Sequence, residues 1–290
     1  MGEETPMRVK SKKRGVVLLA LATLGALFSG ACATGINRPK NPPARLDPAV
    51  AEVVLLGGMH GYHKGHPRYP TSRVAEILDK LHPSLVLIEW SVNRFQDGKP
   101  LDETLKFLEE TTGSEDEVAW SYSKRSGATC LPYDIAKRDK FYRDNKFFER
   151  EKPFYQAIWN ELKANYPLLD LGVHQHFAIK AICRDSAAEV VNSALCDKIV
   201  ETDHEFRSQV VELVSREKDI PDEEFGQMER EEWSRRNRAM AENICQAAQG
   251  RLGQRIVVTM GYEHRYALKK LLSETCKVAR VREFWEILGE

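Results

Sequence analysis

The chain carries no excess of either charge. Its 290 residues include 43 Lys and Arg against 43 Asp and Glu, which gives a formal net charge of +0 at pH 7. The protein therefore has no overall electric field that would attract nucleic acid. Basic residues are also not interleaved with aromatic residues in the manner of a nucleotide-binding groove. We expect no nucleic-acid partner.

Several signatures of cofactor sites are missing as well. The sequence contains neither a Walker phosphate-binding loop nor a GxGxxG motif. Its six cysteines include no CxxC pair, which excludes a zinc-ribbon site. In an exported chain the five cysteines beyond Cys32 are disulfide candidates, and because five is an odd number at least one should stay free. Cys130 lies in an apolar run and is the candidate for a buried thiol.

The N-terminus predicts export. It contains a basic segment, MRVKSKKR, then an apolar stretch of signal-peptide length, GVVLLALATLGALF, and then LFSGAC, which offers a cleavage site before Cys32. This order resembles a bacterial lipoprotein signal, although Ser29 stands where leucine is usual. Ordinary cleavage after Ala31 or Ala33 and an uncleaved signal anchor therefore stay open as alternatives.

We accordingly expect three parts in the chain. Residues 1–31 form the signal peptide, and residues 32–50 form a lipid-bearing cysteine followed by a proline-rich tether. Residues 51–290 are enough for one α/β domain with a large core. This organisation predicts an exported lipoprotein of the cell envelope, facing the periplasm or attached to the outer membrane, with the membrane as a partner through the lipid anchor.

Four apolar runs predict buried parallel strands, and each run ends in a polar side chain. VVLLGGMH ends at His60, SLVLIEW delivers Glu89, TCLPYD delivers Asp134, and RIVVTMGYEH ends at His264. Open α/β sheets form their sites at the carboxyl ends of such strands, so we expect these four side chains to converge. Imidazole nitrogen and carboxylate oxygen suit Zn, Mn, Co or Fe. For Asp134 a simpler alternative is capping of the following helix.

Two of these runs end in the same Gly-x-x-His phrase. Glycine permits close backbone approach and a sharp turn, which a strand needs if it presents the next side chain to a site. Glu263, next to His264, is a third carboxylate within reach. It is a candidate for acid/base chemistry, with a solvated position at a helix start as the alternative.

The remaining pattern is mainly helical. TSRVAEILDKLHPS predicts a helix between the first two strands with Thr71 or Ser72 as its cap, and LDETLKFLEETTG predicts another that stops at Gly113. From about 137 to 250 the sequence is almost wholly helical, and this block is either a cap over the carboxyl edge or scaffold on a sheet face. The fold class we predict is α/β, a mostly parallel sheet flanked by helices, with a large helical insertion between the third and fourth predicted strands.

Three further histidines are less informative. GMHGYHKGHPRYP is too rich in glycine to be helical, so we expect His63 and His66 on a mobile loop at the mouth of the site, where they contact substrate or nothing. Completion of a metal site by these two imidazoles is the alternative. His204 has no polar company in the sequence, and we expect a structural role for it.

RRNRAMAENI places several arginines on a helix with an apolar stripe, and we single out Arg235 and Arg238. Charge on such a helix is usually a solvated face. The sharper interpretation is that one arginine points into the site, where its forked donors hold a substrate carboxylate or stabilise an oxyanion.

Taken together, these motifs resemble the TraB/PrgY/GumN and Tiki proteins, with erythromycin-esterase-like and ChaN-like proteins as more distant relatives. The resemblance is carried by GGMH (57 to 60), LIEW (87 to 90), RRNRAMAENI (235 to 244) and VVTMGYEH (257 to 264). It implies an α/β sheet with paired Gly-x-x-His motifs and metal-dependent hydrolase activity, with Tiki-like members acting as proteases. By position it nominates His60, Glu89 and His264, with a supporting basic patch from Arg235 to Arg238.

The function we expect is metal-dependent hydrolysis of an amide, peptide or ester bond, in which a divalent cation lowers the pKa of water and a carboxylate takes its proton. The expected metal ligands are His60, Glu89, Asp134 and His264. The expected catalytic residues are Glu89, as ligand or general base, with Glu263, Arg235 and Arg238. The alternative from another class is a non-catalytic lipoprotein that sequesters a peptide or binds haem through histidine and Tyr62, Tyr69 or Tyr262.

Overall fold

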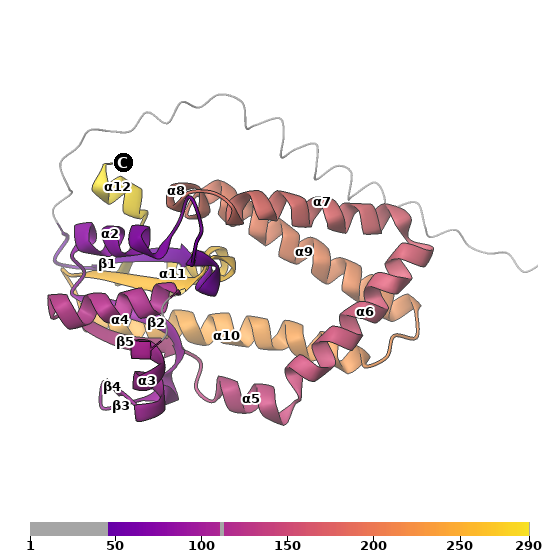
Figure 1. Ribbon diagram of the computed structural model, residues 1–290, viewed down its shortest axis with the longest axis horizontal. Helices are drawn as coiled ribbons and strands as arrows, with labels where there is room; N and C mark the ends of the chain where they lie inside the picture. Colours follow the sequence, from indigo (N-terminus) through magenta and orange to yellow (C-terminus); the bar gives the residue numbers. More distant parts are fainter. Residues whose placement is uncertain (1–45, 111–112, 290) are drawn as a thin grey trace, which may run out of the picture.

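A single parallel sheet forms the centre of the molecule. The structure, a computed structural model, describes residues 46–110 and 113–289 (Figure 1). Five strands lie in the order β5-β2-β6-β1-β7, and all neighbours are parallel. Their bounds are Ala51–Gly58 for β1, Leu85–Ser91 for β2, Thr129–Asp134 for β5, Arg255–Gly261 for β6 and Ala279–Arg282 for β7. The predicted α/β class is confirmed.

The four predicted strands are β1, β2, β5 and β6, and the fifth strand was not predicted. β7 has the four-residue sequence ARVR, and its two arginines leave too few apolar residues to predict a strand. It pairs only with the first half of β1 at the edge of the sheet, where short and charged strands are common. A small antiparallel pair, β3 (Phe95–Gln96) and β4 (Lys99–Pro100), lies apart from the main sheet.

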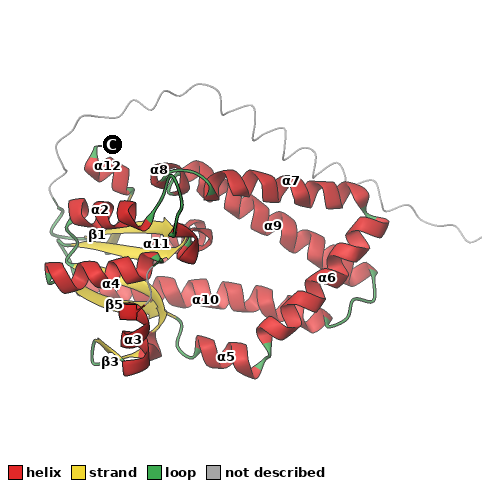
Figure 2. Ribbon diagram, viewed as in Figure 1, coloured by secondary structure: helices red, strands yellow, loops and turns green. Residues whose placement is uncertain are grey.

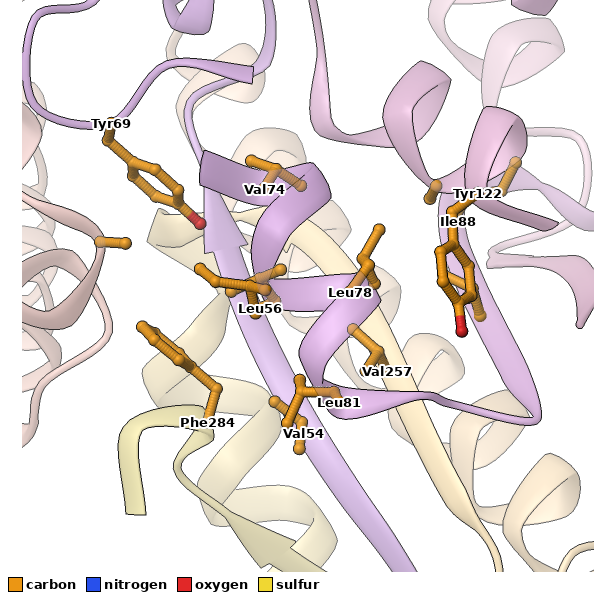
Figure 3. Close-up of a cluster of buried hydrophobic side chains, with 14 of the residues drawn as sticks. Val54, Leu56, Tyr69, Val74, Leu78, Leu81, Ile88, Tyr122, Val257 and Phe284 are labelled. Carbon is orange, nitrogen blue, oxygen red and sulfur yellow. The ribbon is translucent and has the colours of Figure 1, made fainter. Parts of the chain in front are cut away.

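One face of the sheet is covered by α2 (Thr71–Leu81), α4 (Glu115–Ser126), α8 (Ala188–Val191) and α12 (Phe284–Leu288). Figure 3 shows side chains of α2, such as Val74 and Leu78, packed over Leu56 and Val257 of the strands. The predicted helix after β1 is present as α2, although its N-cap is Pro70 rather than Thr71 or Ser72. Its apolar residues recur at helical spacing, and that is why this face becomes a continuous core.

The second face is covered by α10 (Glu223–Gln249) and α11 (Arg265–Thr275). Met240 and Ile244 of α10 and Leu268 of α11 pack against the strands. A disulfide between Cys245 and Cys276 joins the end of α10 to the end of α11. A second disulfide joins Cys183 to Cys196, and Cys130 is free and buried, as its apolar surroundings in the sequence suggested.

The predicted helical insertion forms an extension beyond the carboxyl ends of the strands (Figure 2). We call it the helical extension, and it consists of α5 (Arg138–Asp144), α6 (Phe147–Asn165), α7 (Pro167–Arg184), α9 (Ala194–Glu217) and the first half of α10. It has its own core, in which Phe154 and Ile158 of α6 meet Val211 of α9 and Phe225 of α10. The C-terminal half of α10 covers the sheet, so the block is partly extension and partly scaffold.

The remaining elements are short. They are the helix α3 (Asp102–Glu110) and three 3-10 turns, η1 (His60–His63), η2 (Val92–Arg94) and η3 (Tyr262–His264). Within residues 46–110 and 113–289, no helix combines the length and the apolarity that crossing a membrane requires. The predicted signal peptide and Cys32 lie outside the described residues.

The close contact between α10 and α6 yields a prediction about stability. An added Cβ at Gly226 of α10 would lie 2.6 Å from Cζ of Phe154, whose ring is held in the core of the helical extension. Alanine in a helix normally stabilises relative to glycine, but we expect Gly226→Ala to destabilise the protein by about 1–3 kcal/mol through overpacking. Urea denaturation measures the change in the free energy of unfolding.

Gly250→Ala is the matched control at the end of the same helix. There an added Cβ would make an ordinary contact, 3.7 Å from the Ala247 carbonyl oxygen, and we expect a small gain or no change. Equal effects of the two substitutions would contradict the close packing of Phe154 on Gly226.

Candidate functional site

The carboxyl ends of the strands bring three of the predicted side chains into one group. Gly58 of β1 lies opposite Gly261 of β6, so the two Gly-x-x-His segments leave the sheet side by side. His60 Nε2 lies 4.0 Å from Oε2 of Glu89, and His264 Nε2 lies 3.7 Å from Oε1 of the same carboxylate. Glu89 thus stands between the two histidines.

Glycine is required at position 261, where the segment that follows β1 lies against the end of β6. An added Cβ at Gly261 would lie 2.8 Å from His60 Nε2, and the Gly261 N–H donates to Oε2 of Glu89 at 2.6 Å. His60 itself has a φ of 49°, in the left-handed region that only a few per cent of non-glycine residues adopt. Such backbone strain concentrates at functional sites, where the surrounding structure holds it in place.

Glu89 is a buried, ionised carboxylate. Its side chain is 5 % exposed, and Arg236 Nη2 donates to Oε1 at 2.6 Å. Burial by itself would raise the pKa of this carboxyl. His264, which is protonated at the low pH where Glu89 titrates, and the positive charges of Arg236 and His60 outweigh burial and hold the pKa of Glu89 well below its usual range.

His264 is held as a neutral ring with a defined tautomer. Its Nδ1 lies 2.8 Å from Oδ1 of Asn237, whose amide nitrogen donates to the Trp233 carbonyl oxygen at 2.8 Å. Because Asn237 presents an acceptor, the Nδ1 of His264 carries the proton, and Nε2 keeps its lone pair. Burial lowers the pKa of His264 to about 4, and the Trp233 ring stacks on the imidazole at 4.3 Å. His264 therefore presents the Nε2 lone pair beside Glu89, where Nη1 of Arg236 lies 3.3 Å away.

His60 is the exposed member of the group, with 55 % of its side chain accessible to solvent. Its Nδ1 lies 3.0 Å from Oε1 of Glu115, which is fully buried. Burial lowers the pKa of a histidine, but the contact with Glu115 and the charge of Glu89 outweigh it and raise the pKa of His60 to about 10. Solvent screens part of this effect.

The arginine that reaches the site is Arg236, which lies between the two that we singled out from the sequence. Arg236 contacts Glu89, both oxygens of Asp134 at 2.8–3.2 Å, and Nε2 of His264 at 3.3 Å. Arg235 instead pairs with Glu232 at 2.5 Å, and Arg238 is exposed.

A signal for Arg236 was present in the sequence. Arg236 stands four residues before Met240 and eight before Ile244, so it continues the apolar stripe of α10 toward the strand ends. Arg235 and Arg238 fall beside that stripe: Arg235 lies over the Phe141 ring, and Arg238 is exposed.

Asp134 anchors arginines. Its oxygens accept from Arg236, from Arg138 Nη1 at 2.5 Å and from the Ile135 N–H at 2.7 Å. We had expected a metal ligand or a helix cap here. The structure uses both oxygens for hydrogen bonds to arginine and backbone, so Asp134 joins the site through Arg236 rather than through the histidines.

Glu263 is turned toward the helical extension. It contacts Lys180 of α7 at 3.1 Å and His204 of α9 at 3.2 Å. Burial opposes ionisation, but the bonds from His204 and Lys180 hold the pKa of Glu263 well below its usual range, which disfavours the expected acid/base role. His204, expected to lack polar company, also lies 3.1 Å from the Tyr266 hydroxyl. The sequence could not reveal this pair because helix packing creates it.

His63 is a buried structural residue, and the expectation of a free position on a mobile loop was wrong. It is 0 % exposed, its Nε2 accepts from the Met59 N–H at 3.0 Å, and its Nδ1 faces the Tyr69 carbonyl oxygen at 2.7 Å. His63 thus supplies hydrogen-bond partners for the N–H of Met59 and the carbonyl oxygen of Tyr69, and buried backbone groups need such partners. His66 accepts from the Tyr69 N–H at 2.8 Å. The Tyr69 hydroxyl donates to the Gly57 carbonyl oxygen at 3.1 Å, which commits this tyrosine to the fold rather than to haem.

Two site residues were missed from the sequence, Glu115 and Asp116 in the first turn of α4. Asp116 is 5 % exposed, and its Oδ1 accepts from the Glu89 N–H at 3.2 Å and the Thr259 hydroxyl at 2.8 Å. Burial, with the charges of Glu115 and Glu89, raises the pKa of Asp116 to about 8. GSEDEV has the form of an ordinary helix start with a capping box, and nothing in it marks these acids as buried.

Comparison with known proteins adds no further assignment. No protein-family model matches the chain, and no curated protein or solved structure matches it. Over the part of the chain that the structure describes, no group of three or more His, Cys, Asp and Glu side chains is arranged to hold a metal ion. The resemblance to the TraB and Tiki proteins therefore rests on the quoted motifs and stays a prediction.

The contacts of Arg236 predict that its loss is costly. Arg236→Ala leaves the buried carboxylates of Glu89 and Asp134 without their shared cation, and we expect destabilisation by about 3–5 kcal/mol, measured by urea denaturation. Arg238→Ala is the control on the same helix, because Arg238 is exposed and its loss should change the stability by less than about 1 kcal/mol. A larger effect at Arg238 than at Arg236 would overturn this assignment.

The environment of Asp116 predicts a pH dependence of stability. In the folded chain its pKa is about 8, whereas in the unfolded chain it ionises near about pH 4. Between these values the unfolded state binds fewer protons, so this carboxyl lowers the free energy of unfolding as the pH rises. Asp116→Asn removes the effect, and its stability relative to the wild type should rise from pH 4 to pH 8.

Urea denaturation at a series of pH values measures this difference. The exposed Asp144→Asn is the control for the loss of a surface carboxylate. A difference between Asp116→Asn and the wild type that does not change with pH would contradict the raised pKa of Asp116.

Proposed function

We propose that the protein is a metal-dependent hydrolase whose divalent cation is held by His60, Glu89 and His264. One observation carries this proposal: the Nε2 atoms of His60 and His264 lie 4.0 and 3.7 Å from the two oxygens of Glu89. Two imidazole nitrogens and one glutamate are a donor set used by catalytic zinc sites. The same set also suits Mn, Co and Fe.

The chemistry of these donors fits a cation. With metal–ligand bonds of about 2.0–2.2 Å, two ligand atoms at a tetrahedral angle lie about 3.4 Å apart, close to the separations around Glu89. Glu89 is ionised and His264 is neutral, which are the forms that bind metal. His60, whose pKa is raised to about 10, has to lose its Nε2 proton when a cation binds. Asn237 fixes the tautomer of His264 in the manner of an outer-shell partner.

Arg236 would share the site with the cation. Its guanidinium donates a hydrogen bond to Oε1 of Glu89. The same guanidinium also donates to both oxygens of Asp134, so Asp134 holds Arg236 in place independently of Glu89. Arginine keeps its charge at every accessible pH and presents forked donors. Arg236 is therefore placed to stabilise negative charge that develops on a carbonyl oxygen of the substrate.

The proposed reaction is hydrolysis of an amide, peptide or ester bond. A bound divalent cation supplies Lewis-acid polarisation and lowers the pKa of water. Glu89, with its lowered pKa, is a weak base, so we assign it to cation binding rather than to proton abstraction. His60, the exposed member of the group, lies on the side from which a substrate arrives. We further propose the predicted exported, lipid-anchored location.

Metal binding is the first test. We expect the purified full chain to bind at least one of Zn, Mn, Co and Fe in calorimetric titration, and His264→Ala to weaken that binding by at least tenfold because one ligand is lost. His174→Ala, on the exposed side of α7, is the matched control and should bind like the wild type. Equal binding by the wild type and His264→Ala would defeat the proposed ligand set.

Activity is the second test, measured on a panel of chromogenic esters and fluorogenic peptides. Glu89→Gln keeps the size and one acceptor oxygen of the side chain but removes its charge. We expect hydrolysis to fall by roughly a hundredfold or more, with metal content reduced in the same sample. Retained activity in both Glu89→Gln and His264→Ala would refute the hydrolase. A strong visible absorption band on adding haem would then favour the binding lipoprotein.

A further inference from the structure

We propose that Glu115 is the positioning residue of His60: its buried carboxylate accepts the Nδ1 proton of His60 and thereby directs Nε2 toward Glu89. The consequence for metal binding rests on the proposed function, whereas the hydrogen bond itself does not. Glu115 comes from the first turn of α4, a segment that the Gly-x-x-His motifs and the strand ends do not include.

The burial of Glu115 demands a donor. The residue is 0 % exposed, and among the described residues no donor forms a well-aligned hydrogen bond with either carboxylate oxygen. A buried carboxylate without a partner is costly, because it loses its hydration and gains nothing in return. The His60 Nδ1 atom lies 3.0 Å from Oε1 of Glu115, within hydrogen-bond distance.

The neighbouring histidine does not supply this donor. His63 Nε2 is 3.5 Å from Oε2 of Glu115, but it already accepts a hydrogen bond from the Met59 N–H. The Nδ1 proton of His63 is directed to the Tyr69 carbonyl oxygen. A neutral His63 therefore has no proton to offer, and the Nδ1–H of His60 is the imidazole donor for Glu115.

The backbone is shaped to admit Glu115. An added Cβ at Gly58 would lie 2.5 Å from Cδ of Glu115, so only glycine at this position lets the carboxyl approach the end of β1. The glycines that precede the two histidines thus have separate tasks: Gly58 makes room for Glu115 beneath His60, and Gly261 makes room for Nε2 of His60 above Glu89.

The helix that carries Glu115 is held at its start. Ser114 is the N-cap of α4, and a capping box links it to Glu117. The positive end of the helix dipole also favours a carboxylate in the first turn. Glu115 is therefore fixed in position, and the ring of His60 is oriented between Glu115 on its Nδ1 side and Glu89 on its Nε2 side.

The contact between Glu115 and His60 predicts how much metal affinity is lost when Glu115 is replaced. A carboxylate that accepts the second ring proton of a ligating histidine fixes its tautomer and orientation, and loss of such a partner typically costs about 10- to 100-fold in metal affinity. We expect a loss of this size for Glu115→Leu. Glu115→Gln keeps an acceptor oxygen and should retain most of the affinity.

The first experiment observes the hydrogen bond by NMR of the metal-free full chain labelled with nitrogen-15 in its histidines. His60→Ala identifies the signal of His60. We expect the Nδ1 of His60 to carry a proton protected from exchange with water in the wild type, in Glu115→Gln and in Glu117→Gln. The last variant is the control, since glutamine also forms a capping box. Glu115→Leu should lose the protected Nδ1 proton.

A protected Nδ1 proton of His60 that persists in Glu115→Leu, or an unprotonated Nδ1 in the wild type, would overturn the assignment of Glu115.

The second experiment repeats the calorimetric metal titrations with the same variants. If the wild type binds no metal, the proposed function fails, and the NMR result still decides the role of Glu115. If the wild type binds metal and Glu115→Leu binds it equally well, the positioning role is refuted. Gly58→Ala, which displaces Glu115, should behave like Glu115→Leu.

Discussion

The arrangement of the site depends on one ion-pair network, the guanidinium of Arg236 held by Glu89 and Asp134. It joins the middle of α10 to the carboxyl ends of β2 and β5. Two buried carboxylates on neighbouring strands repel each other and lose hydration, and a shared arginine offsets both costs. α10 is 27 residues long and belongs to the cores on either side of this contact. The pairing therefore sets how the helical extension meets the sheet.

Around the Arg236 network, residues of the same chemical type have opposite charge states. Glu89 is ionised because positive charge and a backbone N–H face it, whereas burial raises the pKa of Asp116 to about 8. His264 is neutral because it is enclosed, whereas the pKa of His60 is raised to about 10 beside two carboxylates. Pairs of titratable groups whose environments separate their pKa values are a mark of catalytic sites. The division also leaves Glu89 and the Nε2 of His264 in the forms that bind a cation.

The sequence by itself determined the sheet and the residues at its edge. Short apolar runs fit buried strands, and glycine ends two of them, so β1, β2, β5 and β6 were predictable, together with the delivery of Glu89 and the two Gly-x-x-His histidines to one side. The spacing of apolar residues likewise predicted α2 and the helical block. The odd number of cysteines, with the apolar run around Cys130, indicated a buried thiol. These signals are local, because the residues of a segment by themselves show the periodicity that predicts its burial.

Only the tertiary structure decided which polar side chains meet. The choice of Arg236 over its neighbours depends on the rotation of α10 against the strand ends. The place of Glu115 beneath His60 depends on the packing of α4 against β1, and the burial of His63 on the path of the turn that follows. β7 became a strand because β1 offered it a free edge. Each of these outcomes is a contact between residues far apart in the chain, and such contacts are set by how the layers pack rather than by any periodicity within one segment.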